Sequence, residues 1–249
     1  MRIERKLNTP SRANFWKIAG MLSLVYLLVR LPGLMSLPIF GDEAIYLRWA
    51  QLIRGEGISS QSGPVGAVGH HWWVSLADPK PPLHFWILAL FFRLSKDPLV
   101  MARLISVLAG LIWVPLMMAA GREFSVFLVP GKRKFPAHLV GVIAVVLGIF
   151  CPFLAFYQRL ATADALFVAE SVLIVWLSFR WARSVCVAGN RWGSWLNALW
   201  LALAVGSALM TRQGLSYTIC IMPPLALLMH FYGVPRVRVD PTLAVPLER

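Results

Sequence analysis

The polar stretch from Gly41 to Leu83 carries the residues best suited to chemistry. It opens with Gly41-Asp42-Glu43, closes with Asp78-Pro79-Lys80-Pro81-Pro82-Leu83, and lies between strongly apolar runs. A carboxylate at a membrane surface is partly desolvated, which raises its pKa toward working pH and suits it to act as a general base. Lys80, stiffened by neighbouring prolines, is a point charge suited to a phosphate headgroup. The stretch is therefore a candidate active site.

A structural role explains the same two carboxylates. Aspartate is a favoured helix N-cap, and glutamate is favoured in the first helical turn by the unsatisfied N–H groups and the helix dipole. Asp42 and Glu43 stand where such a helix would begin. Both roles stay open, because a capping carboxylate is also a well-oriented one.

Further charged residues flank the apolar runs. Arg103 precedes one run, while Arg159 and Asp164 lie between two others. Each of these residues could anchor a helix at the membrane interface. Arginines are unexpected on the extracytoplasmic side, however, so a cluster of them there indicates an anionic ligand. Glu170 lies inside an apolar run, where an ionisable group is costly. For Glu170 we expect a structural polar contact rather than catalysis.

A divalent metal is left open, and no other cofactor is predicted. His70, His71 and His84 could join Glu43 around such an ion, but nothing in the sequence fixes their spacing. Histidines at a membrane interface more often serve as hydrogen-bonding anchors, which is the favoured interpretation here.

The composition indicates an integral membrane protein. Of 249 residues, 58% are hydrophobic and only 14% are charged, with a mean hydropathy of +0.68, whereas soluble domains average about 25% charged residues. The net charge is +13. The basic residues cluster between the hydrophobic runs, as the positive-inside rule and anionic headgroups require. They do not alternate with aromatic residues on one polar face, so we expect no nucleic-acid partner.

The elements that position these residues are predicted to be helices. We expect an all-α transmembrane bundle of about six or seven spans, with interfacial helices in the first extracytoplasmic loop. A span needs about 20 apolar residues, and segment 82–94 is short for one. If that segment lies at the interface, six spans remain and both chain ends are cytoplasmic. The six lie at about 15–40, 104–121, 136–157, 165–181, 195–211 and 215–232.

Residues 1–235 are predicted to form one membrane module, with the extracytoplasmic loop at 41–81 and a short tail at 236–249. The N-terminal apolar run lacks a small-residue cleavage site, so we interpret it as a retained signal anchor. The expected setting is a bacterial plasma membrane, as part of the cell envelope, with the active site extracytoplasmic and the N-terminus cytoplasmic.

The ordered motifs resemble the N-terminal half of a GT-C-type glycosyltransferase. The similarity is greatest to the branch of protein O-mannosyltransferases and lipid A aminoarabinose transferases, and it covers roughly residues 15–230. The matching pieces are Asp42-Glu43-Ala44-Ile45-Tyr46, Lys80-Pro81-Pro82-Leu83-His84-Phe85-Trp86, Ala102-Arg103-Leu104, Arg159-Leu160-Ala161-Thr162-Ala163-Asp164-Ala165-Leu166 and the turn at 211–215.

The resemblance implies an inverting transferase that moves a hexosyl or pentosyl group from a polyprenyl-phosphate-linked donor to an acceptor hydroxyl. The acceptor would be a lipid, glycan or protein. Asp42 would be the base, Lys80 and Arg103 would hold the donor phosphate, and Asp164 would be a second acidic residue in the cavity. The same motifs make Glu43 a catalytic candidate and Arg159, His84 and Tyr46 substrate-binding candidates.

Two departures from the family leave alternatives open. Family members usually continue with further spans, and Thr211-Arg212-Gln213-Gly214 stands where a Lys-Gly pair is common. We therefore expect acceptor-binding parts to be missing or supplied by a partner. An active transferase and a chain that is inactive through truncation both stay open. A non-catalytic lipid-binding or assembly subunit is the main alternative. A small transporter is disfavoured, because no internal repeat is visible and the charges lie at one interface.

Overall fold

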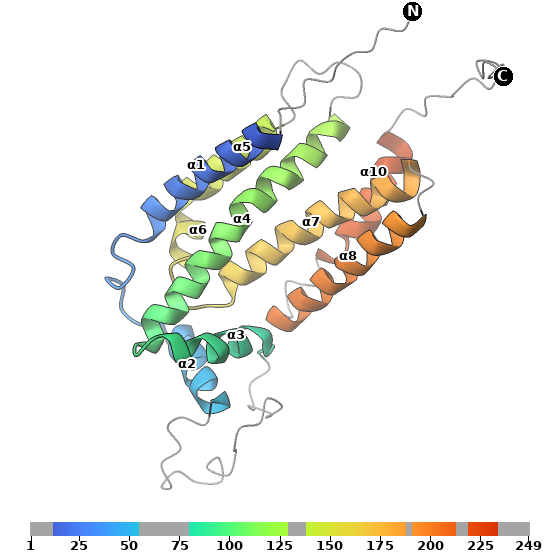
Figure 1. The fold of residues 1–249 in the computed structure, drawn as a ribbon. Coiled ribbons are helices and arrows are strands. Elements are labelled where there is room, and N and C mark those ends of the chain that lie inside the picture. The colour runs from blue at the N-terminus through green and yellow to red at the C-terminus, as the bar shows by residue number, and fades with distance from the viewer. Residues whose placement is uncertain (1–11, 55–79, 129–137, 188–190, 213–218, 234–249) are drawn as a thin grey trace, which may run out of the picture.

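The computed structural model describes residues 12–54, 80–128, 138–187, 191–212 and 219–233, and within these ranges it is helical and contains no strand. Two groups of helices differ in direction (Figure 1). Two short helices, α2 (Gly41–Ile53) and α3 (Leu83–Phe91), lie across one end of a bundle. The helices that run along the bundle are α1 (Arg12–Arg30), α4 (Pro98–Leu128), α5 (Leu139–Phe150), α7 (Asp164–Val187), α8 (Arg191–Thr211) and α10 (Met222–Gly233).

The chain direction alternates along the bundle. Helix α1 runs toward the end covered by α2 and α3, α4 runs away from it, α5 returns, α7 leaves and α8 returns (Figure 1). Helix α7 is central, because it packs against α4, α8 and α10. The start of α4 contacts α2 and α3, and α8 contacts α3. The start of α7 lies at the same end of the bundle (Figure 1), which we call the α2/α3 end.

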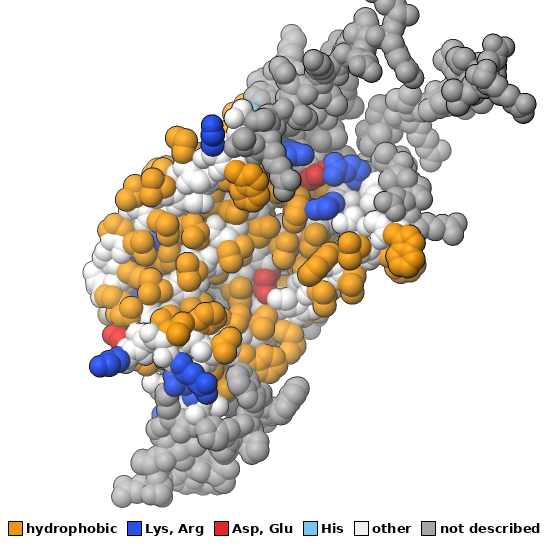
Figure 2. Space-filling model, viewed as in Figure 1, with side chains coloured by type: hydrophobic (Ala, Val, Ile, Leu, Met, Phe, Trp, Pro, Cys, Tyr) orange, Lys and Arg blue, Asp and Glu red, His pale blue; other side chains and the backbone are white. Residues whose placement is uncertain are grey.

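The outer surface of the bundle is apolar. Leu108, Leu147 and Leu199 are among the large hydrophobic side chains that remain exposed, and Figure 2 shows such side chains over the middle of the bundle, with Lys and Arg mainly near its ends. Among the described residues, three helices are long and apolar enough to cross a membrane: Pro98–Ser125, Asp164–Val185 and Trp192–Thr211. The chain is thus an integral membrane protein, while the count of six or seven spans stays a prediction.

Prolines shorten two of the expected spans. Helix α1 ends at Arg30, before Pro32 and a turn in which Gly33 adopts a φ of 61°, a conformation that favours glycine. The run expected at 136–157 is broken at Cys151, because Pro152 starts a separate helix, α6 (Pro152–Tyr157). Proline lacks the N–H that an uninterrupted helix needs. Helix α5 alone has 12 residues, fewer than a span requires.

One of the two crossing helices, α2, lies in the first loop, and the other, α3, lies in the short segment expected at 82–94. Their position at the membrane interface stays a prediction. Helix α2 begins at Gly41 and ends at Ile53, and its buried Ala50 and Ile53 pack with Phe85 and Leu88 of α3. A single 3₁₀ turn, η2 (Phe92–Leu94), extends α3 to the end of the expected segment. The predicted tail at 236–249 and most of the loop lie outside the described residues, so the domain boundaries stay a prediction.

Helices α4 and α5 touch backbone to backbone, which leads to a stability prediction. A Cβ added at Gly141 of α5 would lie 2.7 Å from the Cα of Met118 on α4. We expect Gly141→Ala to lower the free energy of unfolding by about 1–3 kcal/mol, because the helices must separate. Thermal unfolding of the detergent-solubilised protein measures this change.

The matched control is Gly20→Ala on α1, where the added methyl group meets nothing within 4 Å. Both variants change helix propensity equally, by up to about 1 kcal/mol in favour of alanine. An unfolding temperature that rises in both variants would contradict the close packing of α4 on α5.

Candidate functional site

Glu43 is fully buried at the α2/α3 end and is saturated with hydrogen bonds. One carboxylate oxygen accepts from the Arg103 Nε–H at 2.9 Å and the Ala161 N–H at 2.7 Å, and the other from the Arg103 Nη2–H at 2.8 Å and the Phe40 N–H at 2.9 Å. Burial on its own raises the pKa of Glu43, but the hydrogen bonds from Arg103, Ala161 and Phe40 outweigh it and hold the pKa below its usual value. Glu43 is thus an ionised residue without contact to solvent.

Arg103 completes this buried pair and uses every donor that it has. Besides its bonds to Glu43, its Nη1 donates to the carbonyl oxygens of Leu34 and Leu37, and its Nη2 donates to that of Pro38, all within 2.9–3.0 Å. A guanidinium carries five N–H groups, and all five are engaged. Arg103 therefore ties the segment between α1 and α2 to α4, and it has no donor left for a phosphate.

Asp42, next to Glu43 in the chain, faces outward. Its carboxylate lies 3.1 Å from the Nζ of Lys80, and the side chains are 55% and 27% exposed, respectively. The Lys80 ammonium also lies 5.0 Å from the centre of the Tyr46 ring, within the range of a cation–π interaction. The structure thus brings together a carboxylate, a lysine and a tyrosine from the two ends of the first loop.

His84 lies beneath this group, in the first turn of α3. It is 1% exposed, and its ring meets the Tyr46 ring edge-on at 5.0 Å. Burial lowers the pKa of His84 to about 4. At neutral pH the imidazole is consequently uncharged, so it supports Tyr46 but offers no positive charge to a phosphate.

Asp164 and Arg159 make separate contacts at the same end. Asp164, the first residue of α7, forms an ion pair with Arg212, which directly follows α8. The pair lines a cavity of about 210 Å³ together with Tyr157 and Gln158. Arg159 instead donates to the carbonyl oxygens of Pro32 and Gly33. It thereby fixes the turn after α1.

The candidates from the first loop and α4 form two groups with different surroundings. Asp42, Lys80 and Tyr46 meet at an exposed position, whereas Glu43 and Arg103 are buried against each other directly below. Ala161 connects the latter pair to the segment that leads into Asp164. Within the described ranges no cluster of three or more His, Cys, Asp or Glu side chains is placed to hold a metal, and His70 and His71 lie outside those ranges.

Two functional features were not apparent from the sequence. In the sequence, Arg212 stands out only because it departs from a family motif. Its ion pair with Asp164 joins positions that are far apart in the chain, so the sequence does not reveal it. Three of the acceptors around Arg103 are backbone carbonyl groups, which the residue types do not reveal. Glu170 accepts hydrogen bonds from Ser207 and Thr211 of α8, the structural polar contact that its place in an apolar run predicted.

Comparison with known proteins adds one match. Residues 79–239 match the family model described as dolichyl-phosphate-mannose-protein mannosyltransferase. The matched region includes Lys80, Arg103 and Asp164, and it begins after Asp42. Neither the curated proteins nor the solved structures gave a match. Because the family model covers more than half of the chain, the protein belongs to the dolichyl-phosphate-mannose-protein mannosyltransferase family of membrane glycosyltransferases.

Proposed function

We propose that this protein transfers a sugar from a polyprenyl-phosphate-linked donor to an acceptor hydroxyl at the α2/α3 end, with inversion. The observation that carries the proposal is the exposed ion pair of Asp42 and Lys80, with 3.1 Å between Oδ1 and Nζ. A carboxylate and a lysine side by side supply the two functions that such a transfer needs. One is a proton acceptor for the hydroxyl, and the other is a positive charge for the leaving phosphate.

The reaction assigns one role to each residue. The acceptor oxygen attacks the anomeric carbon while the Asp42 carboxylate takes the hydroxyl proton. The bond between the anomeric carbon and the phosphate oxygen breaks, and polyprenyl phosphate leaves with the bonding electrons. Lys80 stabilises the negative charge on that phosphate. Lys80 lies against Asp42, so an arriving phosphate would draw the ammonium away and free the carboxylate for the proton.

In this proposal the buried pair below the site has a positioning role. Glu43 and Arg103 were expected to take part in catalysis and in phosphate binding, respectively. Their polar atoms are occupied by each other and by backbone groups. We assign them to holding the start of α2, and hence Asp42, in place. Asp164, paired with Arg212, remains the candidate for a second acidic residue in the substrate cavity.

The donor site is tested by replacing Lys80. We expect Lys80→Ala to weaken binding of polyprenyl phosphate by about tenfold or more, since a charge-assisted hydrogen bond to phosphate is lost. Mass spectrometry of the lipids that co-purify with the detergent-extracted protein, followed by titration with polyprenyl phosphate, measures the loss and identifies any attached sugar.

Lys96→Ala is the matched control. Lys96 is an exposed lysine in the short connection before α4, so its replacement removes the same charge near the same end of the bundle. Equal affinities of the two variants for polyprenyl phosphate would refute the assignment of Lys80.

A further inference from the structure

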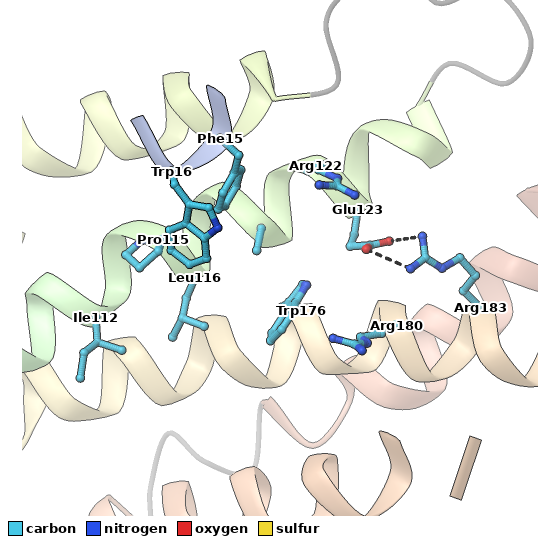
Figure 3. Close-up of a pocket in the computed structure, with 11 residues that line it drawn as sticks. Phe15, Trp16, Ile112, Pro115, Leu116, Arg122, Glu123, Trp176, Arg180 and Arg183 are labelled. Carbon is cyan, nitrogen blue, oxygen red and sulfur yellow. Dashed lines mark hydrogen bonds and ion pairs between the residues drawn. The ribbon is translucent and has the colours of Figure 1, made fainter. Parts of the chain in front are cut away.

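A groove opens between α1, α4 and α7 at the end of the bundle opposite to α2 and α3 (Figure 3). Its volume is about 710 Å³, within the range of about 300–1,000 Å³ that is typical of small-molecule sites. Ile112, Pro115 and Leu116 of α4 form an apolar wall, and Trp16 of α1 stands beside them. The groove is thus an amphipathic site far from the proposed active site.

The charges at the mouth of this groove are unbalanced. Three arginines line it, whereas Glu123 supplies one carboxylate. That carboxylate is engaged by Arg183, with 2.9 Å between Oε2 and Nη1. Arg180 lies over the Trp176 ring, 5.4 Å from its centre, and Arg122 is exposed on α4. Arg122 and Arg180 consequently leave a net positive charge at the mouth, which favours an anionic ligand.

The depth of the groove matches one leaflet of a bilayer. Arg122 and Ile112 are ten positions apart on α4, which corresponds to about 15 Å along a helix. The hydrocarbon core is about 30 Å thick, so the groove extends from the headgroup level toward the midplane. The apolar spans end nearby, at Ser125 and Val185. Arg122 and Arg180 therefore lie where lipid phosphates lie, and the apolar wall lies where acyl chains lie.

A second groove meets the first at the same arginine. It lies between α7 and α8 and has a volume of about 540 Å³. Its lining includes Leu173, Leu177 and Leu203, and also the Glu170 carboxylate, which accepts a hydrogen bond from Ser207. Trp176 and Arg180 line both grooves, so they form the ridge that separates them. Two channels that are lined mainly by apolar side chains and meet at one basic side chain suit a ligand with two chains and one anionic headgroup.

We propose that these grooves bind an anionic diacyl phospholipid from the surrounding leaflet. Its phosphate contacts Arg122 and Arg180, and one acyl chain lies in each groove on either side of Trp176. Scattered interfacial arginines would provide a general attraction to anionic lipid. A concave site with an apolar floor instead selects and retains individual lipid molecules. This inference is independent of the proposed function, because it involves the opposite end of the bundle.

The test compares the lipids retained by the full chain. The detergent-solubilised protein is equilibrated with equal amounts of phosphatidylglycerol and phosphatidylcholine, and native mass spectrometry counts the bound molecules. We expect wild type to prefer phosphatidylglycerol by about tenfold, and Arg122→Ala with Arg180→Ala to abolish the preference. The matched control, Arg93→Ala with Lys96→Ala, removes the same charge from exposed positions near the α2/α3 end and should keep the preference.

A second variant tests the groove without changing its charge. Ala119 lines the groove on α4, and Ala119→Phe should fill part of the space and reduce the number of retained phosphatidylglycerol molecules. Circular dichroism and gel filtration check that each variant is folded. The proposal is overturned if wild type shows no preference, if the control variant loses it equally, or if Ala119→Phe retains lipid as wild type does. Displacement of the lipid by glycerol phosphate at similar concentration would also overturn it, since the ligand would then be a soluble anion.

Discussion

Asp42→Asn is expected to lower the rate of sugar transfer by about 10²–10⁴-fold, the usual contribution of a general base. Asparagine has the same shape as aspartate but cannot take the proton of the acceptor hydroxyl. The Asp42 side chain is 55% exposed, and the exposed ion pair with Lys80 contributes at most about 1 kcal/mol to stability. The variant should therefore fold normally and still bind the donor lipid. Initial rates with the donor identified by mass spectrometry, together with donor affinity, separate these effects.

Asp97→Asn is the matched control for this experiment. Asp97 is an exposed carboxylate before α4, and its Oδ1 accepts hydrogen bonds from the Leu99 and Val100 N–H groups. Asparagine caps helices as well as aspartate does, so this variant should keep wild-type stability and rate. A rate for Asp42→Asn within twofold of wild type would exclude Asp42 as the base. A wild-type chain that binds the donor but transfers no sugar would instead support the non-catalytic, lipid-binding alternative.

Arg103→Ala is expected to reduce the free energy of unfolding by about 3–5 kcal/mol, because removing one member of a buried ion pair leaves the other charge uncompensated. Glu43 would then be a buried carboxylate without its main partner, and the carbonyl groups of Leu34, Leu37 and Pro38 would lose their donor. Glu43→Ala should lower the free energy of unfolding by a similar amount. The double variant should lower it by less than the sum of the two single variants, since neither charge remains. Thermal unfolding in detergent measures all three variants.

The stability that Glu43 provides should also depend on pH. Hydrogen bonding holds the pKa of Glu43 in the folded protein below its ordinary value of 4.5. Its contribution is therefore present above pH 4.5 and is lost as the pH falls through the folded-state pKa. The free energies of unfolding of wild type and Glu43→Ala should accordingly differ most near neutral pH and become similar in acid.

The same variants separate a positioning role of Arg103 from phosphate binding. Lys80→Ala, at an exposed ion pair, should change the free energy of unfolding by about 1 kcal/mol or less. If Arg103→Ala has the same free energy of unfolding as Lys80→Ala but no longer binds polyprenyl phosphate, Arg103 binds the donor and our assignment is incorrect. If Arg103→Ala is strongly destabilised, its hydrogen bonds to the α1–α2 segment account for the effect.

The amino-acid sequence by itself determined the membrane class, most of the helices and the family. Long apolar runs predict helices because the bilayer provides no other partner for backbone groups. Pro32 and Pro152 already marked where two runs stop, although the expected spans ran through them. The order of the Asp-Glu, Lys-Pro-Pro and Arg-containing motifs indicated a GT-C-type transferase, and the match at residues 79–239 supports that family. All of these signals are local in the chain.

Only the tertiary structure separated the environments of Asp42 and Glu43. Successive residues on a helix point in directions about 100° apart, so two adjacent carboxylates at the start of α2 cannot share one environment. Which of them turns inward depends on what packs beneath the helix, namely Arg103 of α4 and the Ala161 N–H. Those partners are remote in the chain, and one of them is a backbone group. The sequence therefore revealed that carboxylates are present at this site, while long-range packing decided which of them stays exposed.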